Sequence, residues 1–213
     1  IDDRHELKAL PKLAGQFGVA LLVAASGLRI TLFVHNEIFS YVITALWLVT
    51  VINAFNFIDN MNGLCGGLGA IGAILFAIIA AVHGEYLVAI MAFLMAGALI
   101  GFLPYNFPKA RAFLGDSGSH LVGYLLAVMA ILPHFYNRQN PHPLAVLSPL
   151  LVLAVPLGDL AQVVLFRSLK GKPFWIGDTN HLSHWLTRQN LSRTHSVLLI
   201  WLIAVMIGIL ATL

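Results

Sequence analysis

Long apolar runs separated by short polar stretches dominate this chain. Seven runs are long enough, or nearly so, to cross about 30 Å of hydrocarbon at roughly 20 residues per crossing. This pattern predicts an all-α, polytopic helical membrane protein with about seven transmembrane helices in one domain, residues 1–213. The predicted segments are 14–33, 39–58, 64–83, 86–105, 118–135, 144–166 and 196–213.

Composition supports the same class. Of the 213 residues, 59% are hydrophobic and only 10% are charged, values far from those of soluble domains. The pI is about 9.2, but no basic run alternates with aromatic residues, so we expect a lipid bilayer and no nucleic acid as partner. The single cysteine, Cys65, excludes an internal disulfide framework.

Lysine and arginine are distributed unequally between the two sets of connections. If the N-terminus is cytoplasmic, ten of them lie in inside connections, whereas only Arg29 and Arg138 lie outside. The bias predicts that the longest connection, 168–195, is cytoplasmic. Because the orientation rule is nearly blind to acidic residues, their sorting to the same side favours a functional explanation. The inside acids are Asp2, Asp3, Asp59, Asp116 and Asp178.

One polar stretch, NFPKARAFLGDSGS at residues 106–119, lies between two apolar runs. Its only carboxylate, Asp116, sits in a Gly/Ser-rich turn, with Lys109, Arg111 and Phe113 close by in sequence. A carboxylate placed beside cations and an aromatic ring is suited to bind a hard cation next to a nucleotide diphosphate. The alternative is an ordinary polar connection between two membrane helices.

Three amides lie near the cytoplasmic end of the second run. Asn53, Asn56 and Asn60 are spaced three and four apart, with Asp59 beside them. This spacing places the three amides on one helical face. Amides at membrane depth are costly unless they bond to a neighbouring helix or line a polar cavity. Three amides with an acid favour a substrate cavity, and helix–helix hydrogen bonding is the alternative for any one of them.

Two adjacent carboxylates, Asp2 and Asp3, precede the first run and are followed by Lys8 and Lys12. Neighbouring negative charges repel each other, so at least one of the two gains from a divalent cation or a cationic partner. A solvated chain terminus without a specific partner is the alternative.

Two further groups each have two interpretations. Asp159 lies in an apolar run, where it is either a functional group or the partner of a cation such as Arg167. His181 and His184 are three apart and would share one face of a helical turn. They suit contacts to phosphate or sugar better than a zinc site, for which further ligands are missing.

Four stretches in order along the chain resemble one membrane family. They are IDDRHELKALPKLAGQ, NAFNFIDNMNGL, NFPKARAFLGDSGS and GKPFWIGDTNHLSH, and together they resemble the polyprenyl-phosphate N-acetylhexosamine-1-phosphate transferases. That family includes the bacterial enzymes that start enterobacterial common antigen, O-antigen and wall teichoic acid, and the MurNAc-pentapeptide translocase. The resemblance implies an integral-membrane catalytic domain in the bacterial plasma membrane, with its active site on the cytoplasmic side.

The resemblance also implies roles for individual residues. Asp116 matches a magnesium-ligating aspartate, and Asp2 and Asp3 match an aspartate pair near the metal and the lipid phosphate. Whether Asp2 acts as a base or supports the metal stays open. The expected substrate contacts are Asn53, Asn56 and Asp59 on the nucleotide-sugar side, Asn106 and Phe113 at the uracil, and His181 and His184 in a histidine-rich loop.

By this resemblance, the protein transfers a HexNAc-1-phosphate from a UDP-sugar to undecaprenyl phosphate and releases UMP, as the first membrane step of cell-envelope polysaccharide synthesis. The cofactor would be Mg²⁺, with Mn²⁺ as a substitute, and relatives suggest a homodimer. The sequence His-Leu-Ser-His favours the GlcNAc-type branch, hence UDP-GlcNAc. A membrane transporter or flippase and a non-catalytic remnant are the competing interpretations.

The chain departs from the family's pattern at several positions. Asn60 and Asn62 stand where the Asp-Gly-x-Asp-Gly pattern has its first glycine and second aspartate. Ser183 stands where another histidine is common, and His120 replaces an apolar residue. Family members carry further membrane helices before the aspartate pair, so we expect this chain to be N-terminally truncated, which puts its activity in isolation in question.

Overall fold

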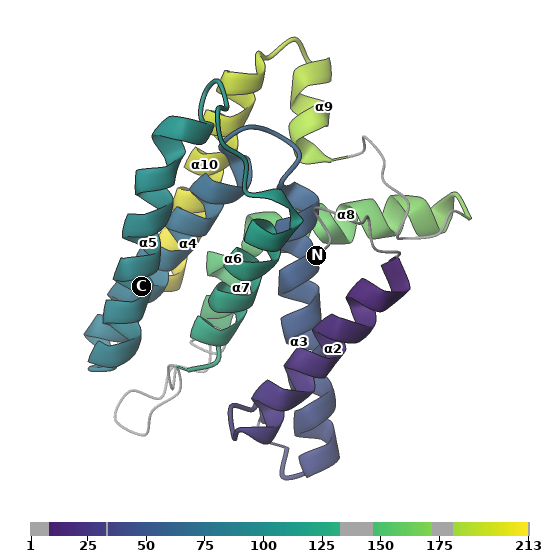
Figure 1. Ribbon diagram of the computed structural model, residues 1–213, viewed down its shortest axis with the longest axis vertical. Helices are drawn as coiled ribbons and strands as arrows, with labels where there is room; N and C mark the ends of the chain where they lie inside the picture. Colours follow the sequence, from purple (N-terminus) through teal and green to yellow (C-terminus); the bar gives the residue numbers. More distant parts are fainter. Residues whose placement is uncertain (1–8, 33, 133–146, 172–180, 213) are drawn as a thin grey trace.

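Every regular element in the described part of the chain is a helix (Figure 1). The computed structural model describes residues 9–32, 34–132, 147–171 and 181–212. The all-α class predicted from the apolar runs is confirmed. In chain order the elements are α2 (Ala9–Ala25), α3 (Glu37–Ile58), α4 (Leu64–Val82), α5 (Tyr86–Asn106), α6 (Gly115–Met129), α7 (Ser148–Val152), α8 (Ala154–Leu169), α9 (Leu182–Arg188), α10 (Arg193–Ile209) and the 3-10 turn η2 (Leu210–Thr212).

Among these described helices, four are long and apolar enough to cross a membrane: α3, α4, α5, and α10 together with η2. Helix α2 is apolar but shorter, with its apolar part at Leu10–Ala25. The exposed outer faces carry many large apolar side chains, for example Leu87 and Leu94 on α5, as expected of helices that face lipid tails. The protein is a multi-pass membrane protein.

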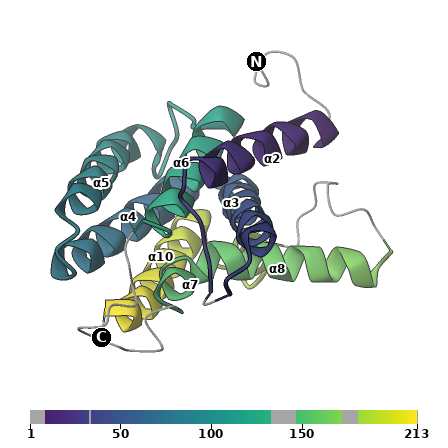
Figure 2. The ribbon, with the colours of Figure 1, turned by 90° about the horizontal axis from the view of Figure 1, so that it is seen from below.

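The predicted span 144–166 is not one helix. It divides at Leu153 into the short α7 and the longer α8, and α8 projects sideways from the other helices in two views at right angles (Figures 1 and 2). Pro156 explains the break, because it has no amide hydrogen to donate to the carbonyl of Val152, one turn earlier. The residues before 147 in this segment lie outside the described part.

Two other predicted segments have different bounds. The first helix runs from Ala9 to Ala25 instead of over residues 14–33, so it ends before the polar residues that interrupt the run. Helix α6 ends at Met129, short of the predicted end at residue 135. The predicted connection 168–195 contains a helix of its own, α9.

Helix α6 packs closely against α3, and this contact positions much of the polar site. A Cβ atom built on Gly123 of α6 would lie 2.8 Å from the Cα of Ile52 and 3.0 Å from the carbonyl oxygen of Val51. Only a residue without a side chain therefore allows the two helix backbones to approach this closely. The approach brings the first turn of α6 beside the last turns of α3.

Several helix ends meet at one end of the molecule, the upper end in Figure 1. Here α3 and α5 end, α4 and α10 begin, and α9 lies beside them. The turn between α3 and α4 and the connection between α5 and α6 are therefore neighbours, although about forty residues separate them in sequence, as the hydrogen bond between Gly63 and Asn106 shows (|i−j| = 43). Asn60, Asn62 and Asn106, described below, belong to these helix ends and connections.

Candidate functional site

Four polar side chains from three helices form a connected group, which we call the Asp116 cluster: Lys12, Asn56, Asp116 and Ser119. Lys12 Nζ lies 2.6 Å from Asp116 Oδ2. Asn56 Nδ2 donates to Asp116 Oδ1 at 3.2 Å and to the hydroxyl of Ser119 at 3.1 Å. Asp116 also lies in the first turn of α6, where the helix dipole favours a negative charge. The carboxylate is held by a cation, an amide and the helix end.

Helix α2 reaches the site with two polar side chains on one face. Gln16 lies one turn after Lys12, and its Oε1 accepts a hydrogen bond from Asn53 Nδ2 at 2.6 Å. Gln16 is buried. The spacing of four residues points both side chains of α2 at the polar residues of α3 and α6, so α2 is joined to the site by two specific contacts.

A small cavity of about 140 Å³ opens beside the carboxylate and is lined by Lys12, Asp116, Ser117 and His120. Asp59, just beyond the end of α3, is close enough to be affected by the charge of Asp116. Burial, together with that negative charge, raises the pKa of Asp59 from 3.8 to about 6. The site therefore combines two acids with one cation, and added positive charge would stabilise it.

Hard oxygen ligands suited to a divalent cation are present, but not as a complete set. Within the described residues, no three His, Cys, Asp or Glu side chains gather closely enough to hold a metal ion. Asp116 offers carboxylate oxygens next to a cavity, and its contact with Lys12 shows that a cation is stable there. A magnesium ion usually takes one or two carboxylates and completes its shell with substrate phosphates and water. The donor set fits that mode.

Helix α9 is anchored by a buried acid of α8. Asp159 Oδ2 lies 2.7 Å from His181 Nδ1, and its Oδ1 accepts the backbone amide of Leu182 at 2.7 Å. The side chains of Asp159 and His181 are both buried. His181 is thus a partner of Asp159, and the guanidinium of Arg167 lies over the ring of Phe57 at 5.3 Å. Asp159 fixes the first turn of α9.

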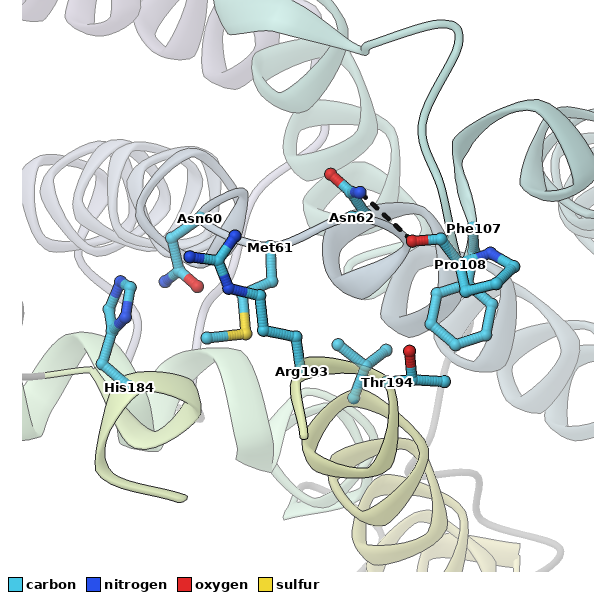
Figure 3. Close-up of a pocket in the computed structure, with 9 residues that line it drawn as sticks. Asn60, Met61, Asn62, Phe107, Pro108, His184, Arg193 and Thr194 are labelled. Carbon is cyan, nitrogen blue, oxygen red and sulfur yellow. Dashed lines mark hydrogen bonds between the residues drawn. The ribbon is translucent and has the colours of Figure 1, made fainter. Parts of the chain in front are cut away.

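A second cavity, also of about 140 Å³, lies between α9, α10, the turn after α3 and the connection after α5. Figure 3 shows its side chains, with the guanidinium of Arg193 extending toward the side lined by Asn60. We call it the α9 pocket. It combines amides, a cation, an imidazole and apolar groups, and it is lined by Asn60, Met61, Asn62, Phe107, Pro108, His184, Arg193, Thr194 and Val197.

His184 is the imidazole of the α9 pocket. Burial, followed by the positive charges of His181, Arg188 and Arg193, lowers its pKa below the ordinary value of 6.5, and Asp159 opposes this only in part. At neutral pH the ring is therefore uncharged. A neutral imidazole offers one donor and one acceptor nitrogen, which suits a hydrogen bond to a polar ligand.

Hydrogen bonds join the turn after α3 to the connection after α5. Gly63 N donates to Asn106 Oδ1 at 2.7 Å, and Asn106 Nδ2 donates to the carbonyl of Ala112 at 2.8 Å. Gly63 has φ +79°, and a Cβ there would also lie 2.6 Å from the ring of Phe107, so no other residue fits easily. The buried side chain of Asn106 thus holds the two backbone segments of the pocket wall together. Its predicted contact with uracil stays a prediction.

Comparisons with known proteins agree with this picture. One family, described as glycosyl transferase family 4, matches residues 1–134. The chain belongs to glycosyl transferase family 4. It is 32% identical over 219 residues to a probable undecaprenyl-phosphate N-acetylglucosaminyl 1-phosphate transferase of Bacillus subtilis, an alignment covering 99% of the chain and 60% of that relative. The resemblance seen in the sequence motifs is confirmed.

Two more members of the family are similar to the chain. A decaprenyl-phosphate N-acetylglucosaminephosphotransferase of Mycobacterium tuberculosis is 34% identical, with 95% of the chain and 56% of the relative covered. An undecaprenyl-phosphate alpha-N-acetylglucosaminyl 1-phosphate transferase of Escherichia coli is 30% identical, with 81% and 48% covered. The chain thus spans between 48% and 60% of the length of these curated relatives.

The structure brings some of the predicted family 4 site residues together. Asn56 and Asp116 are in contact, Asp59 is near them, and Asn53 lies one turn away but binds α2. The prediction that Asn60 shares their face is wrong, because α3 ends at Ile58 and the amide of Asn60 faces α9 instead.

Other predicted residues lie elsewhere. Phe113 is 72% exposed and lines neither of the two cavities described here. His181 binds Asp159, and only its neighbour His184 lines the α9 pocket. Asp2 and Asp3, the remaining residues of the predicted catalytic set, lie outside the described residues, so their predicted roles stay predictions.

Sequence reasoning missed the contacts of Lys12, Gln16 and Ser119 in this family 4 site. The spacing of Lys12 and Gln16 was a usable signal, because two polar residues four apart in an apolar helix indicate a polar partner on that face. Ser119 carried no such signal, since a serine in a Gly/Ser-rich turn is common in any connection.

Proposed function

We propose that this chain carries the reaction centre of a transferase that moves GlcNAc-1-phosphate from UDP-GlcNAc to undecaprenyl phosphate and releases UMP. The observation that carries the proposal is the Asp116 cluster. An acid, an amide and a cation from three helices far apart in sequence converge there beside a cavity. The names of the family 4 relatives, which specify polyprenyl phosphates and N-acetylglucosaminyl phosphate, support the choice of substrates.

In the proposed reaction, an oxygen of the lipid phosphate attacks the β-phosphorus of the UDP-sugar. The new P–O bond forms while the bond to the oxygen that bridges the two phosphates breaks, and UMP leaves with the electron pair. The acceptor phosphate is already largely ionised at neutral pH, so little acid–base work is needed. One phosphoanhydride replaces another, and no further energy source is required.

The main obstacle to this reaction is repulsion between two phosphorylated reactants, and the residues of the cluster address it. Lys12 places a positive charge beside the cavity and would attract the phosphates. Asp116 would hold the magnesium ion, with Asp2 as a supporting ligand, and Asn56 keeps the carboxylate oriented. Bound magnesium, or manganese in its place, would neutralise the diphosphate and the leaving UMP.

The α9 pocket is the proposed site for the nucleotide-sugar part of the substrate. Arg193 offers a cation to an anionic group, and the amides of Asn60 and Asn62 offer donors and acceptors to polar edges. The neutral imidazole of His184 adds one donor and one acceptor. The side that carries the α9 pocket is proposed to face the cytoplasm, because the predicted inside connections hold most of the lysines and arginines, among them Lys109, Arg111, Arg188 and Arg193.

Asp116→Asn tests the proposal. With the protein in lipid nanodiscs, UMP release from UDP-GlcNAc and undecaprenyl phosphate should fall by at least about a hundredfold, as when a group that stabilises transition-state charge is removed. Glu37→Gln, the same change of carboxylate to amide at the opposite end of α3, is the matched control and should keep its activity. Undiminished turnover in Asp116→Asn would refute the role of Asp116. Uptake of UDP-GlcNAc into proteoliposomes with no product formed would favour a transporter instead.

A further inference from the structure

A buried side-chain hydrogen bond joins α9 to the turn after α3. The hydroxyl of Ser183 donates to Asn60 Oδ1 at 2.7 Å. The other end of the same amide is also bound, because Asn60 Nδ2 donates to the carbonyl of Phe57 at 3.1 Å. The amide is therefore oriented by its own helix end, so that its oxygen faces α9. Ser183 is only 2% exposed, and water cannot easily replace this bond.

Helix α9 depends on such contacts for its position. It has seven residues, and a helix this short is not stable without packing or specific anchors. Asp159 anchors its first turn through His181 and Leu182. The bond from Ser183 is the polar contact that ties the helix to the turn after α3, the opposite wall of the α9 pocket.

The two partners of this bond sit next to the cavity. Asn60 itself lines the α9 pocket, and His184, the residue after Ser183, lines it from the side of α9 (Figure 3). Asn60 and His184 therefore line neighbouring parts of the pocket from two different elements. Any loss of the bond would allow α9 to move away from the turn and would widen the pocket.

The two partners are also two of the positions at which the sequence departs from the pattern of the family it resembles. Asn60 stands where a glycine is usual and Ser183 where a histidine is common. A glycine offers no side-chain oxygen to accept the bond, so the hydroxyl at residue 183 has a partner only because of the asparagine. In the structure, the two residues that depart from the pattern, Asn60 and Ser183, bond to each other.

We infer that the Asn60–Ser183 hydrogen bond sets the width of the α9 pocket and thereby its affinity for the nucleotide part of the substrate. Asn60 is the pocket-lining member of the pair, and Ser183 is a positioning residue that acts through Asn60 and His184. The inference rests on the proposed function, which supplies the nucleotide, and goes beyond it by assigning substrate selection to this pair.

The first part of the test asks whether the two side chains are coupled. Ser183→Ala, Asn60→Ala and the double variant are compared with the wild type by thermal unfolding in nanodiscs. Because either single change removes the same bond, the double variant should melt no lower than the less stable single variant. Thr187→Ala removes a hydroxyl from the same helix that bonds only within α9, to His184 O, and should show no coupling to Asn60→Ala. Additive losses for the Ser183 and Asn60 changes would overturn the inference.

The second part asks whether the bond controls binding, with UMP as the probe. Ser183→Ala and Asn60→Ala should each weaken UMP binding by about five- to tenfold, the size expected for one buried hydrogen bond, and the double variant no further. The KM for UDP-GlcNAc should rise by a similar factor, while kcat and the KM for undecaprenyl phosphate stay within about twofold. A merely structural defect would instead lower kcat and affect both substrates.

The outcomes separate this inference from the proposed function. If the wild type binds UMP and releases it in turnover but Ser183→Ala binds UMP equally well, the inference is wrong and the proposed function stands. If the wild type neither binds UMP nor releases it from UDP-GlcNAc, the proposed function fails and with it the assignment of a nucleotide to the pocket. The unfolding measurements then still decide whether the pair holds α9 in place.

Discussion

The two polar centres of this protein are built in different ways. In the Asp116 cluster, side chains that project from the helices α2, α3 and α6 meet directly. In the α9 pocket, a turn, a connection and a seven-residue helix are held by side-chain amides and one buried acid. The first centre depends on how closely long helices pack, and the second depends on a small number of individual hydrogen bonds.

This difference suits the two tasks proposed for them. Charge stabilisation during phosphoryl transfer needs groups at fixed distances, which rigid helices provide. Recognition of a polar ligand needs several donors and acceptors in a small space, which backbone connections provide more readily. The two centres should therefore respond to different kinds of substitution, and each prediction below tests whether they can be changed separately.

The largest effect is expected at Gly123, where α6 meets the backbone of α3. In Gly123→Leu the side chain would overlap the backbone of Ile52, at 2.8 Å from the Cβ position. We expect a loss of about 3 kcal/mol in the free energy of unfolding, together with loss of turnover, because Asp116 moves away from Asn56. Denaturant titration in detergent measures the free energy of unfolding, and UMP release measures turnover.

Gly97→Leu on α5 is the matched control, because a Cβ there meets no atom within 4 Å. It should keep stability close to that of the wild type. Equal losses in the two variants would show that the α3–α6 contact has no special part in the Asp116 cluster.

An intermediate effect is expected at Asp159. Asp159→Ala leaves the amide of Leu182 without its acceptor and His181 without its buried partner, at a cost of about 1–3 kcal/mol. UMP binding should weaken by about tenfold or more, whereas Mn²⁺ binding at the site proposed for Asp116, followed by electron paramagnetic resonance, should not change. Asp159→Asn keeps one acceptor oxygen, so its stability and its UMP binding should lie between those of the wild type and those of Asp159→Ala. A parallel loss of metal and UMP binding would mean that the two centres are not separable.

A pH-dependent effect on stability is expected at Asp59. The folded-state pKa of Asp59 is raised to about 6, chiefly by burial and then by Asp116, so folding favours the protonated carboxyl. This stabilisation is complete below the unfolded value of 3.8 and is lost as the pH rises through 6. Asp59→Asn should therefore become more stable than the wild type as the pH rises from about 4 to about 7.

Melting temperatures measured with EDTA present would follow this difference without interference from metal ions. Glu85→Gln changes a carboxylate at the opposite end of the molecule and serves as the control. A difference between Asp59→Asn and the wild type that stays constant over the whole range would show that Asp59 has an ordinary environment.

The helices themselves were largely predictable from the sequence, because each long apolar run has few ways to satisfy its backbone other than as a helix. Their ends were less predictable. The division at Leu153 follows from Pro156, a signal that was present in the sequence. The predicted end of the second run at residue 58 agrees with the end of α3 at Ile58, but Asn60 lies two residues beyond it and does not share the helical face that its spacing from Asn56 suggested.

The partners of the site residues were beyond the reach of the sequence. The resemblance to a family identified Asp116 and Asn56 as site positions, but Lys12 and Asp116 are 104 residues apart and nothing in either segment indicates that they meet. The same holds for Ser183 and Asn60, which are 123 apart. Such pairs depend on the packing angle and depth of whole helices, which periodicity does not encode.

The ring of Trp201 packs against Phe107, a wall of the α9 pocket, and its place there depends on Gly67 in the first turn of α4. The ring centroids of Phe107 and Trp201 are 5.0 Å apart, and the Trp201 ring occupies the space that a side chain at Gly67 would fill. Behind Phe107 there is thus an indole ring that fits against α4 where Gly67 has no side chain. A larger side chain at Gly67 would displace Trp201 and then Phe107, and would alter the shape of the α9 pocket through two residues that no polar ligand needs to touch.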